Sequence, residues 1–101
     1  MTLSLTSKQR KVLRGFAHGL SPIVQIGKGG VSDEALGQID RALTAHELIK
    51  VRFLASKAEK EPAVAEILGR TGAAEAGRIG HISILYRPHP EPDKRRIVLP
   101  D

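Results

Sequence analysis

Ile23-Val24-Gln25-Ile26-Gly27-Lys28-Gly29-Gly30 joins a short apolar run to four residues that carry one sizeable side chain, a lysine. Glycine adopts positive φ without strain and lets another backbone approach closely, so this glycine turn, Gly27 to Gly30, can direct several N–H groups at one anion. A helix that starts at Ser32 or Asp33 adds the partial positive charge of its N-terminus on the same side. The stretch predicts a phosphate site, but a flexible turn at the end of a strand accounts for the glycines about as well.

The residues on either side of the glycine turn predict a βαβ unit. Residues 23–26 are dense enough in apolar side chains to form a strand with both faces partly covered. The helix after the turn has apolar residues at helical spacing, and a second strand follows at 48–53. Strand, helix and strand in this order give parallel strands joined by a right-handed crossover. Side chains of the second strand alternate between the two faces of the sheet. Ile49, Val51 and Phe53 form an apolar face, and Lys50 and Arg52 make the other face partly basic.

The N-terminal segment carries the excess charge of the chain. A helix is predicted from Thr6 or Ser7 to about Gly19, with a buried stripe formed by Leu13, Phe16, Ala17 and Leu20. The net charge is +5, and residues 1–30 hold five Lys or Arg and no acid, whereas basic and acidic residues cancel in 31–101. We therefore expect a basic patch beside the glycine turn, suited to a polyanion, although such a helix face can also serve solubility alone. The patch would consist of Lys8, Arg10, Lys11, Arg14 and Lys28.

The second half of the chain predicts a third helix and a hairpin. The helix is expected after the polar residues 55–61, with Pro62 in its first turn. Two antiparallel strands are expected at 76–79 and 82–86, around a hairpin turn that begins with Gly80.

Single residues exclude several catalytic and cofactor motifs. Lys28 is followed by Gly29 where a P-loop needs Ser or Thr, and Ser32 stands where a dinucleotide fingerprint needs glycine. His46-Glu47 begins like a zinc-protease motif, but Lys50 occupies the position of the second histidine. No pair of carboxylates and no Ser/His/acid arrangement stands out, and the chain has no cysteine. We therefore expect a protein that is not an enzyme and has no cofactor, no metal and no small-molecule substrate.

Nucleic acid remains as the expected partner. Of the three aromatic residues, at least Phe16 and Phe53 are expected in the core, which leaves no base-stacking platform of two or three rings. Binding should then rest on phosphates and on RNA shape, with modest sequence discrimination. A DNA-binding or nucleoid protein and a ribosome-associated protein-interaction module remain as alternatives. No window approaches the length of a membrane span and the start lacks a secretory signal, so we expect a cytoplasmic protein without a membrane partner, and a monomer.

The glycine turn is similar to the Gly-x-x-Gly clamp of KH modules, which is a weak signal by itself. Further characteristic segments follow one another over almost the whole chain: Leu5-Thr6-Ser7-Lys8-Gln9-Arg10, Ala17-His18, Pro22 to Lys28, Ala42-Leu43, His46-Glu47-Leu48-Ile49-Lys50-Val51, Thr71-Gly72-Ala73, Ile79-Gly80 and Leu85-Tyr86-Arg87. Together they resemble the CRM domain, named for chloroplast RNA splicing and ribosome maturation, in its stand-alone bacterial form.

The resemblance implies a compact α/β domain over residues 1–101, with three helices and a four-stranded mixed sheet. Its order is βαβαββ after an N-terminal helix, similar to the C-terminal domain of bacterial translation initiation factor 3. The residues 88–101 themselves, and not the resemblance, predict an extended basic tail or an edge strand. Family members bind RNA and the bacterial ones associate with precursors of the large ribosomal subunit, so the implied partner is large-subunit rRNA.

The resemblance also implies where RNA is bound. It places the clamp loop on the glycine turn and a neighbouring basic surface on the N-terminal helix. His46 and Glu47 match a family signature, for which we expect a capping and packing role, and the position after Gly80, often basic in the family, is His81. Together with the basic face of the second strand, the expected RNA contacts are Gly27, Lys28, Gly29, Gly30, Lys8, Arg10, Lys11, Arg14, Lys50 and Arg52.

Overall fold

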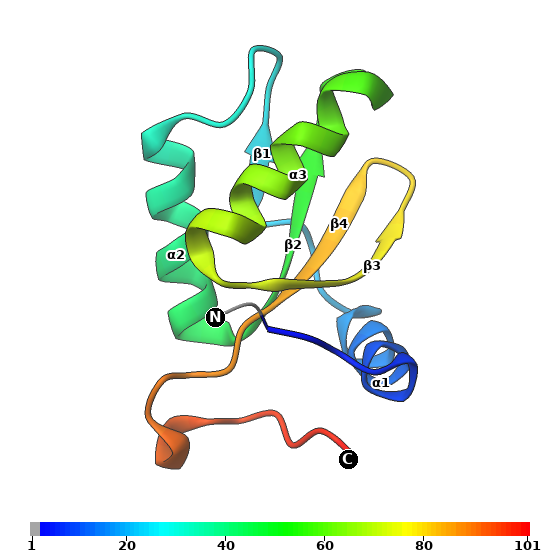
Figure 1. Cartoon of the computed structure of the whole chain (residues 1–101), viewed down its shortest axis with the longest axis vertical. Helices are drawn as coiled ribbons and strands as arrows, with labels where there is room; N and C mark the ends of the chain where they lie inside the picture. Colours follow the sequence, from blue (N-terminus) through cyan, green and yellow to red (C-terminus); the bar gives the residue numbers. More distant parts are fainter. Residues whose placement is uncertain (1–2) are drawn as a thin grey trace.

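The computed structural model describes residues 3–101, in which three α-helices, four strands and one short 3-10 helix follow one another (Figure 1). The α/β class and the order of elements predicted from the sequence are confirmed. Within these residues every helix is too short or too polar to span a bilayer. The elements are α1 (Ser7–Ala17), β1 (Val24–Ile26), α2 (Asp33–His46), β2 (Leu48–Phe53), α3 (Lys57–Thr71), β3 (Ala74–Ile79), β4 (Ile82–Tyr86) and the 3-10 helix Pro92–Lys94.

The strands form one four-stranded mixed sheet, as the family resemblance implies, and the structure shows their order across it to be β1-β2-β4-β3. β1 pairs with β2 in parallel, with Val24 opposite Val51 and Ile26 opposite Phe53, so the predicted βαβ unit is confirmed. β4 pairs with β2 and with β3 in antiparallel fashion. Because β1 and β2 run in the same direction, the glycine turn after β1 lies at the end of the sheet where β2 finishes.

Apolar clusters cover both faces of the sheet. On one face α2 and α3 pack against strand residues that include Val51 and Phe53. On the opposite face Leu13 and Ala17 of α1 pack against strand residues that include Leu48. This second face is the one that alternation in β2 predicts to be partly basic, and α1 covers the part of it where β2 begins.

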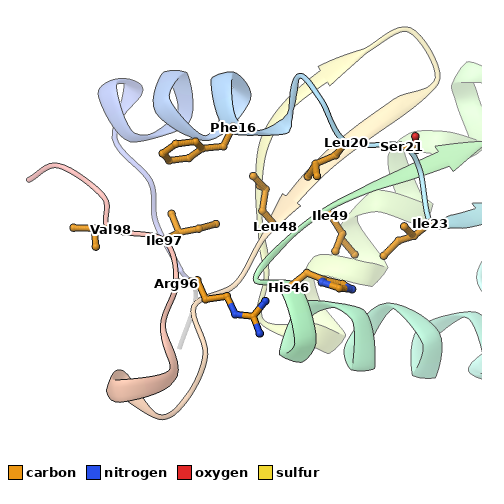
Figure 2. A pocket seen from close by; sticks show the side chains of 10 residues that line it. All are labelled: Phe16, Leu20, Ser21, Ile23, His46, Leu48, Ile49, Arg96, Ile97 and Val98. Carbon is orange, nitrogen blue, oxygen red and sulfur yellow. The ribbon is translucent and has the colours of Figure 1, made fainter.

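Phe16 and Leu20 do not join the buried stripe that the sequence predicts for α1, since they are 56% and 41% exposed. The helix ends at Ala17, so Leu20 lies beyond it. The apolar space beside α1 is filled by Ile97 from the C-terminal segment, which packs against the same cluster. Both exposed side chains instead line an open groove (Figure 2).

α3 begins earlier than predicted. Ser56 is its N-cap, with the Ser56 hydroxyl oxygen accepting a hydrogen bond from the Glu59 N–H at 3.3 Å. The helix therefore starts at Lys57, inside the segment expected to be a polar connection, and Pro62 stands in its second turn. The Lys, Ala and Glu residues after the cap are favourable helix formers, which explains the early start.

The hairpin of β3 and β4 is confirmed, with Gly80 at a φ of +57° in its turn. β3 starts at Ala74, two residues before the predicted strand. A register shift lies between Glu75 and Gly77, and this irregularity hides the first residues of the strand from a simple alternation pattern.

The C-terminal segment, residues 88–101, forms no strand, so the edge-strand alternative is wrong. It folds back on the molecule. The Glu47 carboxylate accepts hydrogen bonds from the N–H groups of His89, Arg96 and Ile97 at 2.9, 2.6 and 3.2 Å. Near the end of the chain, the Gln9 side-chain amide of α1 donates to a backbone carbonyl at 2.8 Å. The segment is therefore tied to the start of β2 and to α1.

Candidate nucleic-acid interface

The glycine turn is an exposed loop with an unusual backbone. Gly29 and Gly30 adopt φ of +95° and +98°, and an added β-carbon on either would meet no atom within 4 Å. Backbone conformation, and not crowding, is therefore what requires glycine here. Lys28 lies between Gly27 and Gly29 and is exposed. Its ammonium group can therefore contact a phosphate.

The N-terminus of α2 contributes less to an anion site than the sequence predicts. Ser32 caps the helix, with its hydroxyl oxygen accepting the Ala35 N–H at 3.0 Å. The exposed carboxylates of Asp33 and Glu34 occupy the first turn and would repel a second anion there. Phosphate binding at this end would rest on the turn backbone and on nearby cations.

The ends of β1 and β2 and the tip of the β3–β4 hairpin lie together beside the glycine turn. The Leu54 N–H donates to the Ile26 carbonyl at 2.8 Å, and the Phe53 N–H donates to the His81 carbonyl at 2.8 Å. The turn, the end of β2 and the hairpin tip therefore lie at one end of the molecule, uppermost in Figure 1. A hollow of about 410 Å³ at this end is lined by apolar and basic side chains without a carboxylate, among them the exposed Arg52 and His81. We call this region the turn end.

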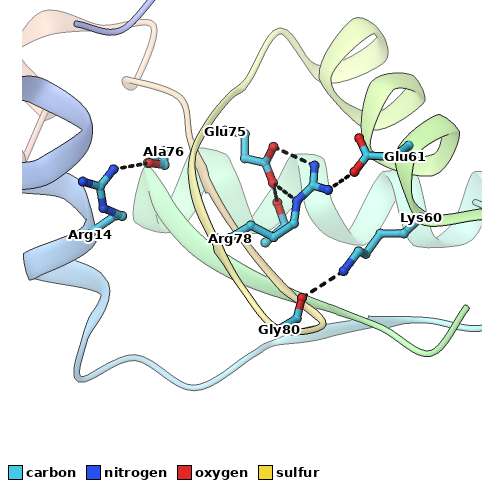
Figure 3. A network of polar contacts seen from close by, with 8 residues as sticks. Arg14, Lys60, Glu61, Glu75, Ala76, Arg78 and Gly80 are labelled. Carbon is cyan, nitrogen blue, oxygen red and sulfur yellow. Dashed lines mark hydrogen bonds and ion pairs between the residues drawn. The ribbon is translucent and has the colours of Figure 1, made fainter. Parts of the chain in front are cut away.

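Residues that buttress the hairpin beside the turn end were not identified from the sequence. Lys60 of α3 is buried and donates from Nζ to the Gly80 carbonyl at 2.9 Å (Figure 3). Arg78 donates to the Glu75 carboxylate at 2.8 and 2.9 Å and also pairs with Glu61, and these bonds raise its pKa further. Both cations are engaged by the protein itself. The sequence gives no signal for the Lys60–Gly80 and Arg78–Glu61 contacts, because their partners come from different elements, whereas Glu75 and Arg78 belong to the same strand.

The basic residues of α1 divide into two kinds. Lys8 and Lys11 are exposed. Arg10 is half-buried and donates to the Leu5 carbonyl at 2.9 Å, which fixes it against the N-terminal segment. Arg14 donates to a β3 carbonyl at 3.1 Å and lies across Gly77, where an added β-carbon would fall 2.5 Å from its Cδ (Figure 3). Lys8, Lys11 and the exposed part of Arg14 remain as a cationic surface.

The structure does not bring the glycine turn and α1 together, so the predicted adjacency is wrong. α1 packs where β2 begins, at Leu48, whereas the turn lies where β2 ends, at Phe53. Six strand residues separate the two points by on the order of 16 Å, and Figure 1 shows them at opposite ends of the sheet. The cause is the connection before β1, which carries the chain from one end of the sheet to the other.

Lys50 and Arg52 also have different environments, although both were predicted as RNA contacts. Lys50 is 9% exposed and donates from Nζ to the Leu20 carbonyl at 2.9 Å, so it fixes the connection between α1 and β1 and does not face solvent. Arg52 is exposed at the turn end. The prediction for Lys50 is wrong because α1 and the residues after it cover that part of the sheet.

Glu47 has the structural role expected from the sequence. It is 2% exposed and, as the C-cap of α2, has a φ of +65°. Burial raises the pKa of its carboxyl, but the hydrogen bonds from His89, Arg96 and Ile97 outweigh burial, and the net pKa lies below its usual value. His46, one residue earlier, is exposed.

Comparisons with known proteins cover nearly the whole chain. A family model described as the CRS1 / YhbY (CRM) domain matches residues 5–87. An RNA-binding protein of Haemophilus influenzae is 42% identical over 89 residues, which are 87% of this chain and 90% of that protein. Probable RNA-binding protein YqeI of Bacillus subtilis is 43% identical over 97 residues, 95% of this chain and 99% of that protein. The solution structure of the hypothetical protein SAV1595 from Staphylococcus aureus superposes with a TM-score of 0.79 at 36% identity and covers 96% of this chain and 100% of that one.

Proposed function

The chain belongs to the CRS1/YhbY (CRM) domain family, as its sequence motifs indicate, and we propose that it is a non-catalytic RNA-binding protein of the cytoplasm that associates with precursors of the large ribosomal subunit and assists their maturation. Proteins similar to it over most of their length are named for RNA binding. The observation that carries the proposal is the turn end, where an exposed glycine loop lies beside cations and no carboxylate lines the hollow.

The turn end is suited to the backbone of RNA. Positive φ at Gly29 and Gly30 leaves their main chain open to a phosphate, and Lys28 supplies a charge in the same loop. Arg52 stands at the end of the neighbouring strand and can neutralise a second phosphate. Phosphate contacts of this kind position an RNA without reading its bases.

The cationic surface of α1 forms a second contact region. Lys8, Lys11 and Arg14 lie near the other end of the sheet from the turn. A short segment of RNA cannot occupy both regions, so the natural ligand is a longer or a folded RNA, such as a structured rRNA precursor. Binding would then depend on the shape of the RNA more than on its sequence.

A charge reversal at each region tests the proposal. Lys28→Glu, and separately the combined reversal of Lys8, Lys11 and Arg14, should each weaken binding of a folded rRNA fragment by tenfold or more at low salt, because each removes phosphate contacts. Arg41→Glu makes the same charge change as Lys28→Glu on an exposed site of α2 and is the matched control for that single reversal. If both variants bound RNA as tightly as the wild type and had the same circular dichroism spectrum as the wild type, the proposal would be contradicted.

The proposed association with precursors of the large ribosomal subunit needs a separate measurement. Tagged protein should sediment in lysate with precursors of the large subunit, and RNA crosslinked to it in those fractions should map to large-subunit rRNA. RNase treatment should release it. Sedimentation that survives RNase would indicate a protein-mediated association, and stronger binding to duplex DNA than to RNA would indicate a nucleoid role.

A further inference from the structure

An apolar groove lies away from the turn end and is used by neither contact region. It has a volume of about 730 Å³ and runs between α1, the end of α2 and the C-terminal segment (Figure 2). Phe16, Ile23 and Val98 line it and are 56%, 50% and 87% exposed. Large apolar side chains gathered in one exposed place usually mark a binding site.

Residues 46–50 line part of the groove and hold the segments that form its other walls. Leu48 and Ile49 form part of its lining. Glu47 fixes one wall, because its carboxylate holds the Arg96 and Ile97 N–H groups at 2.6 and 3.2 Å. Lys50 fixes the other wall, because its ammonium group holds the Leu20 carbonyl at 2.9 Å. Glu47 and Lys50, two buried charged residues three positions apart in the sequence, thus preorganise opposite sides of the groove.

The charge of the groove has a single sign. Its charged or titratable lining residues are Arg96 and His46, which lie across the opening from Phe16 and Leu20 in Figure 2. No carboxylate lines it. The helix that carries Phe16 also carries the exposed cations Lys8 and Lys11 and has no acid in its sequence. The occupant should therefore combine an apolar face with negative charge.

We propose that the groove binds one unpaired nucleotide of the RNA, with its base against the ring of Phe16 and its phosphate at Arg96. The inference rests on the proposed RNA-binding function. A nucleotide carries a flat apolar face and an anion in one unit, and aromatic rings and guanidinium groups are the side chains that unpaired bases stack on. The single exposed ring limits the site to one base. An acidic protein segment would also match the charge, but the cations of α1, a helix without a single acidic residue, suit a polyphosphate better than scattered carboxylates.

A bulged RNA duplex tests this site. We would measure binding to a two-stranded RNA of about 16 base pairs, the span that duplex-binding domains cover, with one bulged adenosine. The matched ligand has an abasic bulge and the same number of phosphates. The wild type should bind the adenosine bulge about tenfold tighter than the abasic one, because stacking on one aromatic ring contributes on this scale.

The variants separate stacking from charge. Phe16→Leu keeps an apolar side chain but no ring, and should lose the preference for the adenosine bulge while binding the abasic duplex as the wild type does. Phe16→Trp should keep the preference, and because the chain has no tryptophan, the introduced indole should lose fluorescence only with the adenosine bulge. Arg96→Gln should weaken binding of both duplexes about threefold or more, unlike the control Arg41→Gln.

The outcomes distinguish this site from RNA binding in general. Lys28→Glu should weaken both duplexes equally and leave the preference for the bulged base intact. Wild-type preference in Phe16→Leu, or unchanged affinities in both the Phe16 and Arg96 variants, would overturn the inference and leave the groove to a protein partner. Failure of the wild type to bind either duplex, or any single-stranded RNA, would overturn the proposed function as well.

Discussion

Gly29 and Gly30 require glycine only because of their backbone, since an added β-carbon would have open space around it. A φ near +95° is strained for any residue with a side chain. We expect Gly29→Ala and Gly30→Ala each to lower the free energy of unfolding by roughly 1–2 kcal/mol, or to distort the turn, and in either case to weaken RNA binding. Urea unfolding and RNA titration measure the two effects.

Gly27 provides the matched control for this prediction. It belongs to the same exposed turn, has open space for a β-carbon and does not have a φ in the left-handed region. Gly27→Ala should therefore leave stability nearly unchanged. An equal loss in all three variants would show that the backbone conformation of the turn is not what its glycines provide.

Glu47 holds the C-terminal segment through its ionised carboxylate, and Glu47→Gln should show this. An amide presents one acceptor oxygen and an NH₂ group, so at least one of the three N–H donors would lose its partner. We expect the free energy of unfolding at pH 7 to fall by about 2 kcal/mol. Urea unfolding of the variant and the wild type gives this difference.

The difference in the free energy of unfolding between the wild type and Glu47→Gln should also depend on pH in a definite direction. The folded-state pKa of Glu47 lies below its ordinary value of 4.5, so the carboxylate stabilises the fold fully above that value. As the pH falls through the lowered folded pKa, the wild type loses this contribution and the gap to Glu47→Gln should narrow. A gap that stays constant from pH 7 to pH 3 would mean that the charge of Glu47 is not what matters.

Lys50 and Arg52 show how far residue-level prediction extends. Alternation along the strand assigns both to the same sheet face, which the structure confirms. It cannot show that α1 and the residues after it cover the position of Lys50 and leave that of Arg52 open. Exposure depends on packing between distant segments, so a basic residue of the sequence is available to a ligand only where no other element covers it.

At the level of elements, the hairpin that borders the turn end is held to α3 by side chains. Arg78 of β3 pairs with Glu61 of α3 and also bonds the Glu75 carboxylate of its own strand twice, and its side chain is 26% exposed. Glu75 also accepts from the hydroxyl of the buried Ser83 at 2.6 Å. We expect Arg78→Ala to lower the free energy of unfolding by about 1–2 kcal/mol, because a half-buried carboxylate loses its charged partner.

An exposed arginine on the neighbouring helix gives the comparison. Arg70 is 57% exposed and its ion pairs, to Asp33 and Glu66, are 3.8 and 3.6 Å long. Arg70→Ala should change stability by less than about 0.5 kcal/mol, as open surface pairs do. Thermal unfolding of the two variants side by side would test this, and equal effects would contradict the importance assigned to the hairpin bonds.

Element order was predictable because hydrophobic periodicity and turn residues are local signals. The residues at which the elements start were less predictable. Ser56 caps α3 ahead of a segment that looks like a connection, and a bulge at Glu75 conceals the first residues of β3. The exposure of Phe16 was not predictable either, since its spacing within α1 predicts burial, and that ring lines the groove.

At the scale of the whole molecule, charge along the sequence did not predict charge in space. The sequence predicts one patch formed by the basic residues of the first thirty positions and the glycine turn, but the sheet separates α1 from the turn by the length of β2. Local periodicity contains no information about which end of a sheet a preceding helix will cover. Only the packing of Leu13 and Ala17 against the start of β2 decides it.

The two proposed contact regions, on a molecule 37 Å long, should make RNA binding depend on the length of the RNA. A single strand of about four nucleotides, the number that a Gly-x-x-Gly loop clamps, should reach only Lys28 and Arg52, with a log–log salt slope of about −1.4. A strand several times longer should also reach Lys8, Lys11 and Arg14, with a slope of about −3.5. Fluorescence anisotropy at several salt concentrations measures both slopes.

The combined reversal of Lys8, Lys11 and Arg14 should bring the slope for the long strand to that of the short one or below it, and should hardly affect the short strand. Lys28→Glu should lower the affinity for both lengths, because the turn takes part in each complex. Equal slopes for short and long strands in the wild type would mean that RNA uses one region only. In that case the region whose reversal abolishes binding is the interface, and the other basic surface serves a different purpose.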